Sequence, residues 1–412
     1  MNAQELAQSL QRLIDALPST ISESNILRAH IATETATALP PGSESFVEAL
    51  KSVADVINGD PDLIALGNRT LVYPGGAGRI SGIDLMFRLI RLARRASVPD
   101  AMADLATLLE ASELTAYLNL GVAGVEIETA RALGGGIEVL PFSALSEIDS
   151  TLVSLKGYRI PDFGFDSPTA VFRKALRIPA IWRTGDSETP LAADIPKADF
   201  SPLLTAMNCV TIAGPSAPYV VAQWLSFDLR LLTAGFGHGG TTETRRAEVT
   251  LSDAQWEDAR TLHEEWSKLP LRWPDVLEVS VQRLNSAMRR RSPVDRAIDL
   301  GIAFESLFSE EGDPTSELTF RISSRAAFLL GATIAERKAV AKLFKTLYGL
   351  RSTAVHEGRF PRTKRKGRIS EQDVFPILEE GFRVVAQALR TVIQRGGVHW
   401  DDVMFGDSSP PA

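Results

Sequence analysis

The sequence predicts a multidomain α+β protein with a helical N-terminal segment, a β-rich middle domain and an all-helical C-terminal domain. Three observations support this fold class. The chain has 412 residues, which is enough for two or three domains with separate cores. Helical periodicity dominates residues 1–112, and short β-type runs bounded by Gly and Pro dominate residues 113–250. Helical periodicity returns over residues 251–412, now with clear capping signals.

The composition is that of an ordinary globular protein, with 44% hydrophobic and 23% charged residues. The net charge of −7 disfavours nucleic-acid binding over the whole surface, so any such binding requires a local basic patch. The single cysteine, Cys209, excludes an intramolecular disulfide and fits a reducing compartment. The first 15 residues lack the pattern of a signal peptide, and no apolar run is long enough to span a membrane. We therefore expect a cytoplasmic protein without membrane contact.

In the N-terminal segment, residues 43–57 and 82–96 have apolar side chains at three- and four-residue spacing, which predicts two amphipathic helices. The second has two interpretations, a solvated basic face over a core stripe or a face for RNA or a membrane surface. Its basic side chains are Arg88, Arg91, Arg94 and Arg95. The glycine-rich residues 74–82 lack the Gly-Lys-Ser/Thr ending of a phosphate-binding loop, so nucleotide binding there is disfavoured.

The middle section predicts an antiparallel sheet with few helices. Residues 137–142, 180–182 and 208–212 are the short β-type runs. The last of these places Cys209 in a buried strand, which argues against a catalytic thiol.

Two glycine-rich stretches of the middle section, residues 134–136 and 235–240, predict turns. His238 lies in the second, without the Cys or His neighbours that a zinc site needs. The sequence also shows no signature of paired carboxylates. We therefore expect neither a metal nor a cofactor.

Capping signals divide the C-terminal domain into helices. Capping-box patterns begin at Ser252 and Thr333, Ser292 precedes a proline at a first helical position, and Ser370 begins a weaker variant. These signals predict helices over residues 253–267, 275–290, 293–309, 316–330, 334–356 and 371–395. The apolar stripes of the last four predict a helical bundle with its core over residues 293–395.

The most informative motif is the segment 347–358, in which Arg351 and His356 lie five positions apart. An imidazole moves protons near neutral pH, and a guanidinium holds a phosphate through its planar fork. Gly358 and Pro361 end the predicted helix, so His356 is expected in its last turn, where the helix dipole attracts a cation. A bare spacing match also arises by chance, so its surroundings must supply specificity.

The geometry of the pair favours a site built from two chains. Five residues of helix rotate by about 140°, so the two side chains do not share a face. They converge only through the length of Arg351, a distorted helix end or a second copy of the helix. The surroundings are basic, with Glu357 as the one acid, which fits either phosphate contact or a solvated basic loop. The basic residues are Lys345, Arg351, Arg359, Arg362, Lys364, Arg365, Lys366 and Arg368.

A wider frame, residues 303–308, 317–322, 325–330 and 347–358, resembles the HEPN superfamily, and within it the Apea-like branch. The resemblance covers mainly residues 293–395, and residues 133–142 are similar to the region that precedes the HEPN module in such proteins. HEPN modules are helical bundles that commonly dimerise. Their catalytic members are metal-independent endoribonucleases in which four to six residues separate an Arg from a His.

The resemblance implies roles for individual residues. Arg351 and His356 match the catalytic pair with four intervening residues. Ser352 stands where Asn, Asp or His is usual, and Glu357 precedes Gly358 where the branch often has Gly directly after the His. The implied supporting residues are Ser352, Glu305, Arg321 and Arg325; for the last three, helix-surface ion pairs are the alternative. The implied RNA-binding residues are Arg359, Arg362, Lys364, Arg365, Lys366 and Arg368.

The implied reaction is attack of an RNA 2′-OH on the adjacent phosphorus, with His356 moving a proton and Arg351 stabilising negative charge. The implied setting is antiviral defence or abortive growth arrest, in which a homodimer formed through the C-terminal domain acts as a toxin. Residues 1–250 would sense an unknown trigger or restrain the nuclease. Two alternatives stay open, an inactive HEPN bundle used for dimerisation and RNA binding, or an acceptor of nucleotidyl groups at Tyr348.

Overall fold

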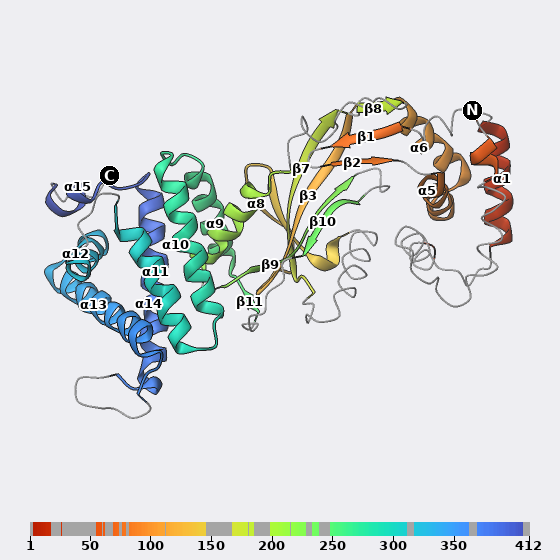
Figure 1. The fold of residues 1–412 in the computed structure, drawn as a ribbon. Helices are drawn as coiled ribbons and strands as arrows, with labels where there is room; N and C mark the ends of the chain where they lie inside the picture. The colour runs from red at the N-terminus through yellow and green to blue at the C-terminus, as the bar shows by residue number, and fades with distance from the viewer. Residues whose placement is uncertain are drawn as a thin grey trace.

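The computed structural model shows three successive parts, helices at the N-terminal end, sheets in the middle and a helical domain at the C-terminal end (Figure 1). The structure describes residues 3–17, 26, 55–59, 61, 69–73, 76–79, 82–111, 113–145, 167–179, 181–184, 198–214, 216–227, 233–238, 248–310, 317–361 and 369–406. This arrangement confirms the predicted α+β class. No helix among the described residues combines the length and apolar character that a bilayer crossing requires.

The N-terminal part contains helices α1 (Ala3–Ala16), α5 (Gly82–Arg95) and α6 (Val98–Glu110), which pack around a small apolar core of their own. Ser97 caps α6 by accepting a hydrogen bond from the backbone N–H of Asp100 at 3.2 Å. The helix predicted over residues 82–96 is confirmed, whereas that over 43–57 lies mostly outside the described residues.

The basic face predicted for α5 is wrong at two of its four arginines, whereas Arg95 is exposed. Arg88 and Arg91 are only 6% and 7% exposed, and the Nε of Arg88 donates to Asp104 of α6 at 2.6 Å. Burial of a long cation costs less when a carboxylate on a neighbouring helix takes its hydrogen bonds. These two side chains are therefore not free to bind RNA or a membrane surface.

Residues 69–73 and 76–79 correct a second prediction, because they form strands within a segment that the sequence predicts to be helical. Strands β1 (Arg69–Tyr73), β2 (Gly76–Arg79) and β8 (Ile181–Thr184) form an antiparallel sheet in the order β2-β1-β8. The run Thr-Leu-Val-Tyr at residues 70–73 is rich in strand-forming residue types, and this local preference decides the structure.

The main sheet has six antiparallel strands in the order β10-β9-β3-β7-β6-β5, which confirms the predicted sheet type. Its strands are β3 (Glu113–Ala123), β5 (Arg131–Gly134), β6 (Ile137–Pro141), β7 (Ala170–Pro179), β9 (Tyr219–Phe227) and β10 (Thr233–His238). The 3-10 turn η1 (Phe142–Ala144) follows β6. Two short strands, β4 (Val125–Glu126) and β11 (Val249–Thr250), pair in parallel beside it.

The two glycine-rich stretches of this region differ in structure. Gly134, Gly135 and Gly136 connect β5 to β6 with φ angles of 79°, 59° and 75°, a left-handed path that glycine adopts without strain. That turn is confirmed. The second prediction is wrong, because residues 235–238 belong to strand β10, which has a register irregularity between Ala234 and Gly237.

The prediction that residues 208–212 form a strand is also wrong, because they lie in helix α8 (Ser201–Ala213). Most of α8 is buried and most of its residues are apolar, and a short apolar run does not distinguish a strand from a buried helix. Cys209 is fully buried, as predicted, and burial raises the pKa of its thiol far above the ordinary value. A thiol in this state is a poor nucleophile.

The C-terminal domain confirms the six predicted helices, although α10 begins three residues earlier than predicted. They are α9 (Asp253–Trp266), α10 (Arg272–Arg289), α11 (Pro293–Phe308), α12 (Leu318–Leu330), α13 (Ile334–Glu357) and α14 (Glu371–Gln394). A short additional helix, α15 (Trp400–Phe405), packs against α12. Ser252, Ser292 and Thr333 cap their helices as expected, whereas Ser370 makes no capping hydrogen bond to the backbone.

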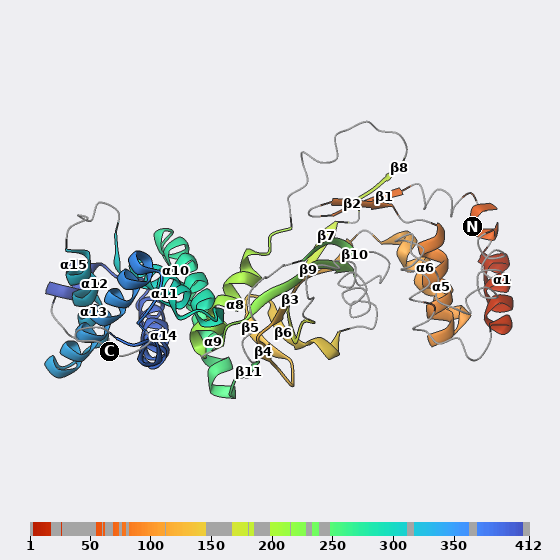
Figure 2. The ribbon, with the colours of Figure 1, turned by 60° about the horizontal axis from the view of Figure 1, so that its bottom comes forward.

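One continuous apolar core joins the main sheet to the helical domain through α8 and α9. Helices α9 and α10 lie nearest the sheet, and α12 and α13 lie on the far side (Figures 1 and 2). In the centre of the bundle, Phe304 of α11 and Phe344 of α13 meet edge to face with ring centroids 5.7 Å apart. This core fixes α13 against α11, the contact on which the candidate site depends.

Candidate active site

Helix α13 carries both residues of the predicted catalytic pair, and both of its ends are well defined. Thr333 and Glu336 form a reciprocal capping box, in which the Thr333 backbone N–H donates to Glu336 at 2.9 Å. Gly358 adopts a φ of 64° and donates its N–H to the carbonyl of Ala354 at 3.1 Å. The helix therefore ends just after His356, which lies in the last turn as predicted.

Arg351 lies across the surface of α11. A Cβ atom on Gly301 would lie 2.3 Å from Cγ of Arg351, so the absence of a side chain there lets the arginine stem approach the helix. One turn further along α11, Nη2 of Arg351 donates to Oε2 of Glu305 at 3.3 Å, and Nε lies 3.2 Å from Oε1. Gly301 and Glu305 together orient the guanidinium group by shape and by an ion pair that contains one hydrogen bond.

The charge of Glu305 is less favourable than that of an ordinary surface carboxylate. Burial raises the pKa of Glu305 more strongly than the nearby Arg351 lowers it. The Arg351 side chain is 28% exposed and that of Glu305 19%, so the guanidinium still reaches solvent.

His356 is exposed, and its side chain has no hydrogen-bond partner among the described residues. The fold does not bring His356 close to Arg351. In an uninterrupted helix the two positions differ by about 140°, so Arg351 lies against α11 while His356 is turned away from it. Ser352, next to Arg351, is half-buried. Tyr348 packs partly buried against the core, which fits a structural role better than an acceptor role.

Two other predicted supporting residues lie on α12. Arg325 is 6% exposed, and its Nη1 donates to the carbonyl of Phe308 at 2.7 Å. Its guanidinium carbon also lies 5.4 Å from the ring centroid of Trp400. Arg325 thus donates a hydrogen bond to the carboxyl end of α11 and packs against α15. This role is structural and does not involve Arg351. Arg321 is half-buried on the same helix.

The predicted RNA-binding residues fall mostly outside the described part of the chain. Arg359 is described, and it is exposed directly after the helix cap at Gly358. The others lie between residues 362 and 368, which the structure does not describe; they are Arg362, Lys364, Arg365, Lys366 and Arg368.

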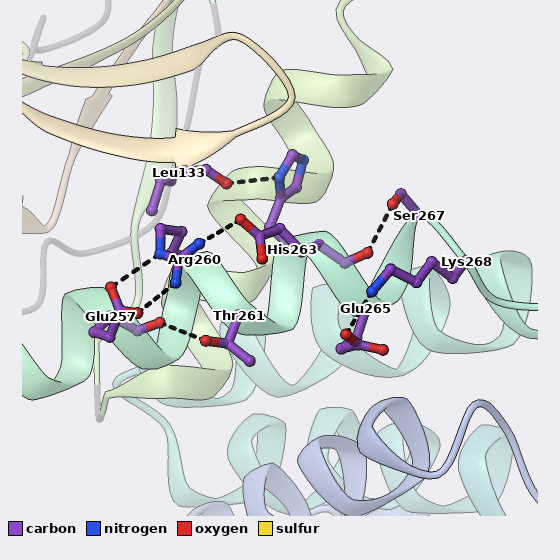
Figure 3. Close-up of polar contacts among 9 residues, drawn as sticks. Leu133, Glu257, Arg260, Thr261, His263, Glu265, Ser267 and Lys268 are labelled. Atoms are coloured by element: carbon purple, nitrogen blue, oxygen red, sulfur yellow. Dashed lines mark hydrogen bonds and ion pairs between the residues drawn. The ribbon is translucent and has the colours of Figure 1, made fainter.

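Sequence reasoning missed a second histidine at a helix end, His263 in the last turn of α9. This side chain is 8% exposed, and its Nδ1–H donates to the carbonyl of Leu133 in β5 at 2.9 Å (Figure 3). Burial lowers the pKa of His263, so the neutral ring with a proton on Nδ1 is favoured. It therefore connects the sheet to the helical domain. No short sequence motif signals this role, because Leu133 is 130 positions away.

The polar residues around His263 are those of a helix surface. Arg260 pairs with Glu257 and Glu264 on the same helix (Figure 3). Lys268 pairs with Glu265, one turn apart, and the Ser267 hydroxyl donates to the carbonyl of Glu264 at 2.7 Å. Such exposed pairs support a helix and contribute little energy each. These pairs therefore lie along the surface of α9 and its end, and the hydrogen bond to the main sheet comes from His263.

Within the described ranges, no three His, Cys, Asp or Glu side chains gather in a way that would hold a metal ion. Comparisons of the chain with models of protein families, with curated proteins and with solved structures found no match. The assignment of a function therefore depends on the site itself.

Proposed function

We propose that this chain is a metal-independent endoribonuclease of the HEPN type, with Arg351 and His356 as its catalytic residues. The observation that carries the proposal is their arrangement at one helix end. The guanidinium of Arg351 is oriented by Gly301 and Glu305, and the imidazole of His356 is exposed five residues later. One group is suited to hold a phosphate and the other to move a proton.

In the proposed reaction, the 2′-oxygen of a ribose forms a bond to the adjacent phosphorus while the bond from phosphorus to the 5′-oxygen breaks. A base accepts the 2′-OH proton, and an acid gives a proton to the leaving 5′-oxygen. Arg351 stabilises the negative charge that develops on the non-bridging oxygens. The products are a 2′,3′-cyclic phosphate and a free 5′-OH.

The direction of the two side chains supports a site shared between two copies of the chain. Arg351 lies against α11, whereas His356 is turned away and has no partner among the described residues. If the α13 ends of two copies meet, His356 of one copy approaches Arg351 of the other. Two such Arg–His pairs form in the dimer, and in each pair the single imidazole moves a proton of the reaction.

The proposed biological role is RNA cleavage in the cytoplasm during antiviral defence or abortive growth arrest, with residues 1–250 controlling the nuclease. The continuous apolar core through α8 and α9 supports such control, because it joins the main sheet to the helical domain by direct side-chain packing.

The first test is incubation of the purified protein with labelled single-stranded RNA in EDTA. Cleavage that yields cyclic phosphate ends, and that is lost in both Arg351→Ala and His356→Ala with unchanged circular dichroism, supports the proposal. Cleavage that His356→Ala leaves at the wild-type rate would contradict the mechanism.

The second candidate is an inactive HEPN bundle that dimerises and binds RNA. The ion pair between Arg351 and Glu305 favours it, because a purely structural arginine would make the same contact. The same cleavage assay distinguishes the two candidate functions, since the inactive bundle binds RNA, forms a dimer and leaves the RNA intact.

A further inference from the structure

One face of α13 carries an unusual series of side chains that ends at His356. Starting at Lys338, the residues follow one another at spacings of four, three, four, three and four, which keeps them within about 40° of one line along the helix. We call this series the lysine face. It consists of Lys338, Lys342, Lys345, Gly349, Ser352 and His356.

The lysine face is exposed and positively charged. Lys338, Lys342, Lys345 and His356 are all exposed, and none of the three lysines forms an ion pair with another described residue. The sequence contains no Asp or Glu between Arg337 and His356. In a protein with a net charge of −7, a row of cations that pairs with no acid in the described part of the chain concentrates positive potential on one surface.

The shape of this face also suits an extended ligand. A Cβ atom on Gly349 would meet nothing within 4 Å, so the helix backbone is open to approach between the lysines and His356. Beside the lysines lies a shallow hollow lined by Ala341 and Thr346 in addition to the three lysines. From Lys338 to His356 the helix extends about 27 Å, the length of several nucleotides.

We propose that the lysine face binds the phosphate backbone of single-stranded RNA and leads it to His356. This inference rests on the proposed nuclease function, and it adds a substrate path that the catalytic pair alone does not define. Lysine ammonium groups contact phosphates without reading sequence, so binding along this face is independent of base identity. A flexible single strand fits, because attack by a 2′-OH requires a backbone free to bring that oxygen opposite the leaving oxygen.

A second copy of α13 lying along the same face is a less suitable occupant. Its three lysines would be brought against the three of the first copy, and apposed like charges oppose association. This charge pattern leaves the carboxyl end of α13, beyond the lysines, for contact between two copies. The part of the lysine face from Lys338 to Lys345 is then free to receive RNA from one side.

The test compares full-length protein with the triple variant Lys338→Gln, Lys342→Gln, Lys345→Gln. A matched control removes three exposed cations elsewhere, with Arg177→Gln, Lys268→Gln and Arg383→Gln, whose side chains are 85%, 65% and 65% exposed. The probe is a labelled 2′-O-methyl RNA oligonucleotide, which lacks the attacking hydroxyl and stays intact. Fluorescence anisotropy measures its affinity between 50 and 200 mM salt, and thermal melting checks that both variants fold.

The slope of log affinity against log salt concentration is negative, and loss of three phosphate contacts makes it less steep by about 2. Affinity at 100 mM salt should fall about tenfold or more. The control should lose much less. Affinity and salt slope of the lysine variant equal to those of the control would overturn the inference. So would binding of anionic lipid vesicles through these lysines without binding of RNA.

The inference and the proposed nuclease function fail separately. If wild-type protein leaves unmodified RNA intact but the lysine variant loses binding, the nuclease is wrong and the lysine face stands. If the wild type cleaves RNA and the lysine variant binds and cleaves equally well, the nuclease stands and the lysine face is wrong.

Discussion

Two histidines occupy the last turns of two helices, and their surroundings differ completely. His263 ends α9, where it is buried and its Nδ1–H donates to Leu133 of the main sheet (Figure 3). His356 ends α13, where it is exposed and without a partner among the described residues. The sequence position is alike, yet the first side chain is held in one structural contact and the second is available to a ligand. The element packed over a helix end, rather than the helix end itself, decides which role a histidine takes.

The largest expected effect separates the two histidines by activity. His356→Ala should reduce RNA cleavage by about 10²- to 10⁴-fold, the usual contribution of a general acid or base. His263→Ala should leave the rate for each folded molecule within about threefold of wild type, because the ring lies in a contact between α9 and β5. Single-turnover cleavage, corrected for the folded fraction, measures both. Equal losses of activity in the two variants would contradict the different roles assigned to His263 and His356.

A second prediction concerns the orientation of Arg351. Gly301→Ala places a methyl group against the stem of Arg351, so the guanidinium must move away from Glu305. We expect cleavage to fall by about tenfold or more, since displaced donors stabilise the transition state poorly. The rate constant in single-turnover cleavage is the measurement.

The matched control for the fold is Gly349→Ala, also a helical glycine, where the added methyl meets nothing within 4 Å. Its melting temperature should stay equal or rise, because Ala favours the helix by about 1 kcal/mol over Gly. If Gly301→Ala lowered stability strongly and left cleavage of the folded fraction unchanged, the orienting role of Gly301 would be wrong.

The third prediction concerns stability. His263→Ala leaves the Leu133 carbonyl without its donor and removes a buried ring, so the free energy of unfolding should fall by about 1–3 kcal/mol. His356→Ala should change it by less than about 0.5 kcal/mol, as expected of an exposed side chain. Urea unfolding followed by tryptophan fluorescence gives both values. A larger loss in His356→Ala would show that this histidine is structural.

The fourth prediction uses pH. Burial lowers the pKa of His263 below its ordinary value of 6.5, so the unfolded chain takes up this proton at a higher pH than the folded protein does. The stabilising effect of the neutral ring is complete above about pH 7.5 and is lost as the pH falls through 6.5 toward the folded pKa. The stability difference between wild type and His263→Asn should therefore shrink over that range. A constant difference would contradict a neutral, buried His263.

The sequence predicted features that depend on local chemistry. Thr333 with Glu336, Ser292 before Pro293 and Gly358 at a left-handed position mark the ends of α11 and α13, and each functions as its residue type suggests. Predictions failed where packing against other parts of the chain decides the secondary structure or the burial of a side chain. The apolar run at 208–212 is a helix because α8 is buried on most sides, and Arg88 is buried because Asp104 lies opposite.

The candidate site shows the same division. The spacing of Arg351 and His356 and the helix that carries them follow from the sequence. The close approach of Arg351 to Gly301 and the contact of His263 with Leu133 could not be predicted, because each joins elements that are distant in sequence. The periodicity of the lysine face is visible in the sequence, but its exposure depends on which face of α13 packs against α11 and α12.

The most direct test of the central claim is complementation between two inactive variants. Arg351→Ala retains His356, and His356→Ala retains Arg351. If the active site combines Arg351 of one copy with His356 of the other, mixing the two proteins at concentrations that allow dimer exchange should restore RNA cleavage in EDTA. The account predicts recovery of up to about a quarter of wild-type activity, from mixed dimers with one complete Arg–His pair. Wild-type cleavage without recovery in mixtures shown to exchange subunits would contradict a site shared between two chains.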